Sequence, residues 1–179
     1  VTGVGKVKKE KLVSTGGLQV GDDLVLTKWA GLEGTAIIAA QKREKLLETL
    51  PEELVDTAAD FYQYLSVVPE AKIAVETGVS AMHDVTEGGI FGALWEIGAA
   101  ADLGISADLT KIPIRQETIE VCEVFGINPY QMMSSGSMLI GCAKGNLLVD
   151  RLKEAGIPAA VIGRATDSND RVITNGEEI

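Results

Sequence analysis

The chain has 179 residues, of which 46% are hydrophobic and only 4% aromatic. Its 16 Lys and Arg residues against 26 Asp and Glu residues give a net charge of −10, so counterion release cannot drive binding to nucleic acid. The hydrophobic content excludes a disordered chain and predicts an aliphatic core. Glu96 and Asp102 interrupt the longest apolar stretch, so no segment reaches the roughly 18 to 20 residues of a membrane-spanning helix.

The start of the chain, its single histidine and its two cysteines further restrict the kinds of protein and site that are possible. The chain begins Val1-Thr2-Gly3 and its first methionine is Met82, from which we expect a domain excised from a longer protein. Its lysine-rich opening segment lacks the apolar stretch of a signal peptide, and we expect a cytoplasmic location. A single histidine, His83, excludes sites built from two histidines of this chain. Cys122 and Cys142 do not form a C-x-x-C pair, and two buried thiols are favoured over a disulfide between them.

Strand-like and helix-like periods alternate along the chain. The first half predicts a strand over Asp23–Thr27 and helices over Glu33–Leu50, from Pro51 to Leu65, and from Pro69 to a left-handed cap at Gly78. The second half predicts strands over Val79–Met82, Ile105–Leu109, Met138–Cys142, Ala159–Ile162 and Val172–Thr174, the last opening a hairpin at Asn175-Gly176. The helices expected between them are Ile90–Ala101 closed by Gly104, Glu117–Phe125 ended by Gly126, and one capped by Asn146. Such alternation predicts one α/β domain over residues 1–179, with helices packed on a mixed sheet.

The most informative segment is His83-Asp84-Val85-Thr86-Glu87-Gly88-Gly89, between a predicted strand and a predicted helix. The first turn of a helix offers unpaired backbone N–H groups and the positive end of the helix dipole, and paired glycines let an anion approach the backbone. An Asp at a strand end can hold Mg²⁺ together with phosphate oxygens. These parts predict a phosphate cradle in which dipoles and a metal outweigh the overall negative charge.

The same residues also permit a purely structural interpretation. Asp84 and Glu87 have the spacing of a capping box, in which Asp84 would accept a hydrogen bond from the backbone N–H of Glu87. The pattern alone favours the cap and the phosphate site equally. His83 and Asp84 are neighbours on a strand and point to opposite faces, so we do not expect them to form a catalytic dyad.

Two further segments are candidates for binding an oxyanion or a nucleotide. Met132-Met133-Ser134-Ser135-Gly136-Ser137 places small hydroxyl residues and a glycine before a strand, although a polar turn is the favoured interpretation of this loop taken alone. Gly31-Leu32-Glu33-Gly34-Thr35 joins a predicted strand to a predicted helix, where glycines serve a turn as readily as a ligand.

Taken together, the motifs resemble one superfamily in order and spacing. They are Asp84–Ile90, Glu96-Ile97, Ile112-Pro113-Ile114, Cys122-Glu123, Gly126-Ile127-Asn128-Pro129 and Ser135-Gly136. From Gly21 to Gly163, the chain is similar to the C-terminal domain of the aminoimidazole ribonucleotide (AIR) synthase, or PurM-related, superfamily, which includes selenophosphate synthetase, thiamine-monophosphate kinase and HypE. The motifs from Cys122 onward resemble most the hydrogenase-maturation HypE branch.

The resemblance implies half of a two-domain, ATP-dependent enzyme. Its N-terminal domain, absent here, would form the dimer interface, and ATP and Mg²⁺ would lie between the two domains. The enzyme would phosphorylate a weakly nucleophilic oxygen of a small-molecule or carboxamide-type substrate, with the protein supplying positioning and charge neutralisation. We expect the isolated half to be inactive and to expose an apolar face.

The resemblance also assigns roles by position. Asp84 would contact Mg²⁺ or the phosphates and, with Glu87, would be a catalytic candidate. The remaining contacts with the nucleotide would come from Thr86, Gly88, Gly89, Ser134, Ser135 and Gly136.

The chain departs from the HypE branch at two of these places. Glu87 stands where that branch commonly has Arg, and Ser134-Ser135-Gly136 stands where it commonly has Asn-Glu-Gly. A carboxylate repels phosphate unless a metal intervenes. The alternatives are therefore a non-catalytic nucleotide-binding or assembly module of the same fold, or another branch such as thiamine-monophosphate kinase or selenophosphate synthetase.

Overall fold

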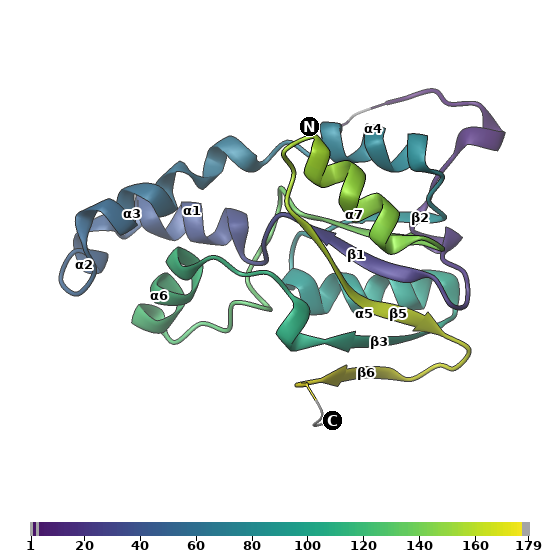
Figure 1. The fold of residues 1–179 in the computed structure, drawn as a ribbon. Helices are drawn as coiled ribbons and strands as arrows, with labels where there is room; N and C mark the ends of the chain where they lie inside the picture. The colour runs from purple at the N-terminus through teal and green to yellow at the C-terminus, as the bar shows by residue number, and fades with distance from the viewer. Residues whose placement is uncertain (1, 3, 177–179) are drawn as a thin grey trace.

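Six strands form one mixed sheet, and a group of helices extends from one end of it (Figure 1). The computed structural model describes residues 2 and 4–176. The strands are β1 (Asp23–Thr27), β2 (Ala81–Asp84), β3 (Gly104–Asp108), β4 (Met138–Cys142), β5 (Ala159–Thr166) and β6 (Arg171–Thr174). The α-helices are α1 (Leu32–Gln41), α2 (Arg43–Leu46), α3 (Glu52–Ala59), α4 (Val68–Thr77), α5 (Gly89–Ala101), α6 (Gln116–Phe125) and α7 (Gly145–Glu154). Short 3₁₀ helices are η1 (Lys9–Lys11), η2 (Thr15–Gly17), η3 (Asp60–Tyr64) and η4 (Leu109–Lys111).

The strand order is β2-β4-β1-β5-β3-β6, and every neighbouring pair is antiparallel except the parallel pair β3–β6. Because β4 and β5 both run antiparallel to β1, they are parallel to each other, and α7 connects them across β1. In the same way α5 connects β2 to β3 across three intervening strands. The predicted α/β fold on a mixed sheet is therefore confirmed, in the form of split β-α-β units.

Alternate side chains of β1 enter two separate cores, because successive residues of a strand point to opposite faces. Leu24 and Leu26 pack with α5 on one face, whereas Val25 packs with α4 and α7 on the other. The predicted aliphatic core is confirmed, since the largest fully buried side chains are Leu and Ile together with Phe61. Burying each such side chain contributes about 1.5 to 3 kcal/mol.

Helices α1, α2, α3 and α6 form a lobe beside the sheet, with its own small core (Figure 1). Where this lobe meets the sheet, Trp29, Phe61 and Tyr64 pack with their ring centroids 5.2 to 6.3 Å apart. The guanidinium of Arg115 lies 5.1 Å from the Trp29 ring centroid. It also donates hydrogen bonds to Glu117, which lower the pKa of that carboxyl.

Several predicted helix ends are confirmed and others are wrong. Gly78 and Gly126 end α4 and α6 in the left-handed conformation, as predicted. The single helix expected over Glu33–Leu50 is instead broken at Lys42, whose backbone leaves the helical region between α1 and α2. Helix α5 ends at Asp102, which itself adopts a positive φ of 56°, so Gly104 is free to begin β3.

The caps and strands of the C-terminal part also differ from expectation. Asn146 does not cap α7, which begins one residue earlier, and the Gly145 N–H donates to Asp23 Oδ2 at 3.1 Å. Strand β5 runs four residues beyond the predicted Ile162, since it pairs with both β1 and β3. Strand β6 confirms the strand predicted at Val172–Thr174, and it pairs in parallel with β3. The return strand expected after Asn175-Gly176 falls on residues outside those described.

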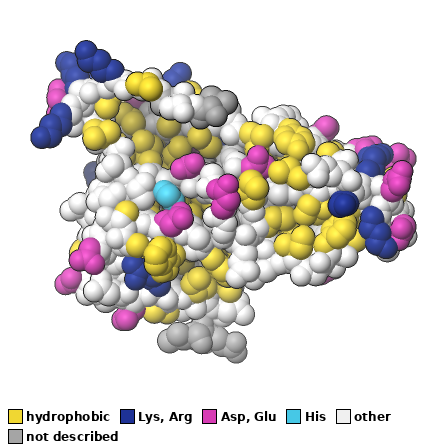
Figure 2. Space-filling view, turned by 180° about the vertical axis from the view of Figure 1, so that it is seen from behind, with side chains coloured by type: hydrophobic (Ala, Val, Ile, Leu, Met, Phe, Trp, Pro, Cys, Tyr) yellow, Lys and Arg dark blue, Asp and Glu magenta, His cyan; other side chains and the backbone are white. Residues whose placement is uncertain are grey.

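Some large apolar side chains lie on the surface. Among the large ones are Tyr62, Val68, Val75 and Trp95, each at least 45% exposed. Figure 2 shows hydrophobic side chains over much of the rear face. That a partner domain covers them stays a prediction. Among the helices of the described ranges, none has both the length and the apolar character needed to cross a membrane.

The two thiols give a direct test of this core. Cys122 and Cys142 are buried and free, as predicted. Burial raises the pKa of Cys122 to about 11 and also raises the pKa of Cys142. Because the thiolate is the nucleophile, we predict that neither reacts with iodoacetamide at neutral pH until denaturant is added. Intact-mass spectrometry measures this, and rapid alkylation of the native protein would contradict the packing.

Candidate functional site

The turn between β2 and α5 holds the residues of the predicted phosphate cradle. Strand β2 runs two residues further than predicted, so the exposed Asp84 lies at its very end. Helix α5 begins at Gly89, preceded by Gly88. Both glycines have positive φ, 81° and 62°, a conformation that side chains with a Cβ rarely adopt. The paired glycines are therefore required by the shape of the turn.

The backbone N–H groups of this turn are only partly engaged. The N–H of Gly89 donates to Thr86 O at 3.1 Å, and that of Phe91 donates to Tyr130 O at 3.2 Å. Within the part of the chain that the structure describes, no acceptor faces the N–H groups of Glu87, Gly88 and Ile90. Glu87 and Gly88 are exposed to solvent. Ile90 is fully buried, so the N-terminus of α5 offers the free N–H groups of Glu87 and Gly88 to an anion.

The capping box proposed for Asp84 and Glu87 is wrong. Asp84 belongs to β2 rather than to the helix boundary, and the N-cap position is taken by Gly88. No side chain caps α5. The spacing of Asp84 and Glu87 suggested a capping box because residue spacing does not reveal backbone conformation. The left-handed conformation of Gly88 and Gly89 places the start of the helix further from Asp84.

The Met132–Ser137 loop lies directly against this turn. The Val85 N–H donates to Ser137 O at 3.1 Å. A Cβ on Gly89 would lie 2.5 Å from Tyr130 O and 2.7 Å from Met132 O, so the loop backbone and the helix start are in contact. Two of the three candidate segments therefore meet in the fold.

The Met132–Ser137 loop also forms hydrogen bonds with the third candidate segment, Gly31–Thr35, which follows β1. The Gly31 N–H donates to Ser134 Oγ at 2.6 Å, and the Gly34 N–H donates to Met133 O at 2.9 Å. Ser137 Oγ donates to Trp29 O at 2.6 Å. All three candidate segments thus form one connected backbone network around this loop.

The predicted ligand residues of the loop differ in burial and in whether a hydrogen-bonding group remains free for a ligand. Ser134 is fully buried, and its single hydroxyl proton is donated to Met132 O at 2.9 Å. Gly136 is buried with a φ of 101°, and a Cβ there would lie 2.8 Å from Tyr64 O. Ser135 is half-buried. Ser134 and Gly136 therefore stabilise the loop from the protein interior. Of the two predicted serines, Ser135 has the hydroxyl that is more accessible to a ligand.

Sequence reasoning missed two ion pairs close to these segments. His83 Nε2 lies 2.7 Å from Glu96 Oε2, and its Nδ1 lies 3.2 Å from Thr15 Oγ1, which joins β2, α5 and η2. Lys28, directly after β1, lies 2.6 Å from the buried Glu70 of α4. The partners are 13 and 42 residues apart in the sequence, which is too far for a helix or strand periodicity to indicate the contact. The only available signal was a lysine placed inside an apolar stretch.

The donors present fit Mg²⁺ only if phosphate completes its coordination. Among the described residues no group of three or more His, Cys, Asp or Glu side chains could hold a metal by itself. Asp84 and Glu87 are exposed carboxylates near the free N–H groups of the turn. Mg²⁺ commonly binds through one or two carboxylates plus substrate phosphates and water. These residues fit that mode of binding.

In this α/β domain, glycine-containing loops lie at the N-terminus of a helix. That arrangement is suited to binding an anionic ligand. The chain belongs to the family described as AIR synthase related protein, C-terminal domain, which it matches over residues 19–175. The resemblance seen in the sequence is confirmed.

The relatives of the chain include HypE proteins and phosphoribosylformylglycinamidine synthase subunits PurL. The chain is 29% identical over 168 residues to carbamoyl dehydratase HypE of Rhodobacter capsulatus, covering 92% of this chain and 47% of that protein. The chain thus spans about half the length of the curated relatives it matches. Escherichia coli HypE shares its fold with a TM-score of 0.76 at 22% identity, covering 93% of this chain and 50% of that one. A HypE solved in complex with ATP gives 0.72 at 16% identity, covering 97% and 53%.

Two glycines that both have a positive φ, Gly78 and Gly89, test how closely the loop and the turn are packed. Gly78 has a φ of 84° and open space around it, so Gly78→Ala should cost roughly 1 to 2 kcal/mol of backbone strain. Gly89→Ala adds a collision with two carbonyl oxygens and should lose at least about 2 kcal/mol more. Urea denaturation measures both free energies of unfolding. Equal losses would contradict the contact between Gly89 and the loop.

Proposed function

We propose that this domain supplies the Mg²⁺- and phosphate-binding side of an ATP site, at the turn between β2 and α5. The observation that carries the proposal is the pair of free, solvent-exposed N–H groups at Glu87 and Gly88 beside two exposed carboxylates. Hydrogen bonds from Val85 to Ser137 and from Phe91 to Tyr130 hold this backbone in place before any ligand arrives. Such preorganised donors bind an anion without a cost of rearrangement.

Asp84 and Glu87 are the residues that would hold the metal. When bound, Mg²⁺ would neutralise phosphate charge and orient the terminal phosphoryl group. The carboxylates would hold the cation, and the helix N-terminus and its N–H groups would bind the phosphate oxygens. The Thr86 hydroxyl, half-buried in the same turn, would add a further donor. Ser135 would approach from the neighbouring loop.

The reaction proposed is transfer of phosphate to a weakly nucleophilic oxygen of a small-molecule or carboxamide-type substrate. Its support is family membership together with the HypE relatives, three of which are carbamoyl dehydratases by name. Because this chain spans about half of those relatives, we propose that an N-terminal domain completes the nucleotide site and the dimer. The isolated chain should then bind Mg-ATP weakly, and the full-length protein tightly.

Glu87 supports one competing function. Its carboxylate is exposed at the mouth of α5 and has no basic partner among the ion pairs of the described residues. Without a metal it would repel phosphate, as expected of a module that assembles with a partner and no longer binds nucleotide. The metal dependence of nucleotide binding separates the two functions.

Substitution of the two carboxylates tests the proposal. In the full-length protein, Asp84→Asn and Glu87→Gln should each weaken Mg-ATP binding by at least about tenfold, because each removes a negative ligand of the metal. Asp150→Asn, on an exposed residue of α7, is the matched control and should leave the affinity unchanged. Isothermal titration calorimetry measures the three dissociation constants. Unchanged affinity in both site variants would contradict the assignment.

Charge reversal at Glu87 decides between the two functions. If Glu87 helps to hold the metal, Glu87→Arg should weaken Mg-ATP binding and abolish its dependence on Mg²⁺. Tighter nucleotide binding by Glu87→Arg, in a protein whose native form binds poorly, would instead favour the assembly module. The same calorimetric titration, run with and without Mg²⁺, distinguishes these results.

A further inference from the structure

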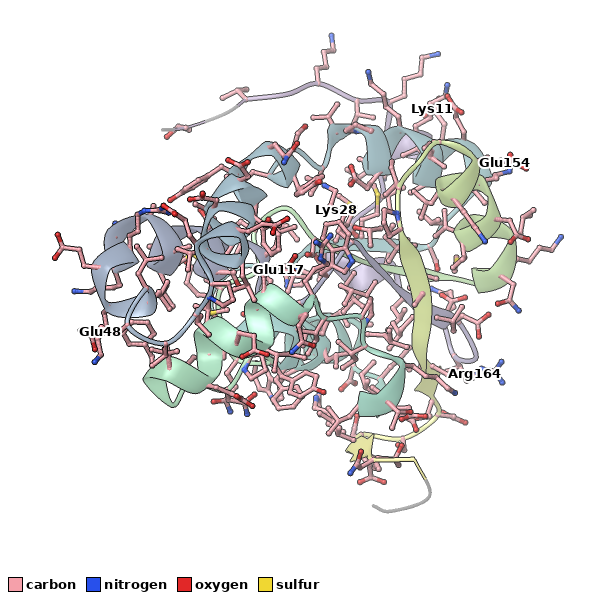
Figure 3. All side chains as sticks on the ribbon, turned by 60° about the vertical axis from the view of Figure 1, so that its left-hand side comes forward. Lys11, Lys28, Glu48, Glu117, Glu154 and Arg164 are labelled. Atoms are coloured by element: carbon pink, nitrogen blue, oxygen red, sulfur yellow. The ribbon has the colours of Figure 1, made fainter. Side chains whose placement is uncertain are left out.

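Lys28 occupies an unusual position between the sheet and the helical lobe. It follows β1 directly, its side chain is only 8% exposed, and its label lies near the middle of the molecule in Figure 3. Its backbone φ is 54°, in the left-handed region that non-glycine residues rarely enter. Such a conformation persists where the surroundings of a residue hold it in place.

The hydrogen bonds of the Lys28 ammonium account for the left-handed backbone conformation of Lys28. Its Nζ donates to Tyr64 O at 2.7 Å and to Ser66 O and Gly136 O, both at 2.8 Å. An ammonium group has three protons, and these three carbonyl oxygens use them all. Glu70 Oε1, 2.6 Å away, is therefore held mainly by charge, and within the described residues neither oxygen of Glu70 has a further partner.

Stability alone does not explain this buried pair. Glu70 is 1% exposed, and removing two charges from water costs about as much as their attraction returns. Apolar residues of similar volume often replace such a pair without loss of stability. What an apolar pair cannot do is direct three N–H bonds at carbonyl oxygens from two different segments of the chain.

One of those carbonyls belongs to the loop of the candidate site. Gly136 is followed by Ser137, whose carbonyl accepts the Val85 N–H, and Val85 begins the turn that carries the free N–H groups. The path from Lys28 Nζ to the turn therefore runs through two hydrogen bonds and one intervening peptide unit.

We propose that Lys28 is a positioning residue, whose buried ammonium fixes the Met132–Ser137 loop and, through it, the turn between β2 and α5. Glu70 places its carboxylate 2.6 Å from that ammonium in the interior. The consequence for ligand binding rests on the proposed function, but the positioning of the loop does not. The two are therefore tested by separate measurements.

The variants separate positioning from charge and from stability. Lys28→Met/Glu70→Leu removes both charges and keeps the interior filled. Lys28→Arg keeps the positive charge opposite Glu70, but a planar guanidinium cannot direct three N–H bonds from one nitrogen at the three carbonyls. It also provides a folded protein should the double variant fail to fold. The matched control is Lys45→Met/Glu48→Leu, which removes an exposed ion pair of the lobe.

Amide hydrogen exchange measures the positioning without any ligand. Protection at Val85 and Ser137 should fall by about tenfold or more relative to amides of β1 and β4, the loss expected for one hydrogen bond from a charged donor. We expect this in the double variant and in Lys28→Arg, and no such change in the control. Equal losses at the loop and in the core strands, or no loss at the loop, would overturn the proposal.

Calorimetry with Mg-ATP on the full-length protein then tests the consequence for binding. Weaker binding by Lys28→Arg, with unchanged protection of the core strands, is the expected result. Unchanged Mg-ATP affinity despite a loosened loop would overturn the link to the site. If the native protein binds no nucleotide, the proposed function fails, and hydrogen exchange still decides whether Lys28 positions the loop.

Discussion

The side chain of Lys28 turns inward at the end of β1 and places its ammonium against three backbone carbonyls and the carboxylate of Glu70. A buried cation must be surrounded by oxygen, so the loops that supply this oxygen cannot move independently. One of them carries Gly136 and, through Ser137, meets the turn before α5. The helical lobe, the sheet and the candidate site are connected at this point.

The chemistry of the site follows from backbone more than from side chains. Two glycines with positive φ turn the chain from β2 into α5, and the step leaves N–H groups without acceptors in the described structure. Those groups and the helix dipole provide positive potential in a protein with a net charge of −10. Under the proposed function, the carboxylates of Asp84 and Glu87 would require a metal before phosphate could approach, and binding would depend on a divalent cation.

Local pattern predicted the alternation of strands and helices, the aliphatic core and the location of the Gly88-Gly89 turn, because all three depend on residues close in sequence. It did not predict the role of Ser134, whose hydroxyl serves Gly31 and Met132 inside the protein. It also proposed a capping box that the structure lacks, since spacing does not reveal backbone conformation. The Lys28–Glu70 pair joins residues 42 positions apart, and the only local sign of it is a lysine inside an apolar stretch.

The central claim is that phosphate binds at the mouth of α5, and the amide resonances of that turn report on it most directly. Titration of the ¹⁵N-labelled chain with a non-hydrolysable Mg-ATP analogue detects even weak binding, residue by residue. We expect shifts centred on Glu87 and Gly88, with smaller ones at Ser135, that disappear when Mg²⁺ is chelated. Saturating shifts confined to another face of the domain, or none at this turn at high analogue concentration, would contradict it.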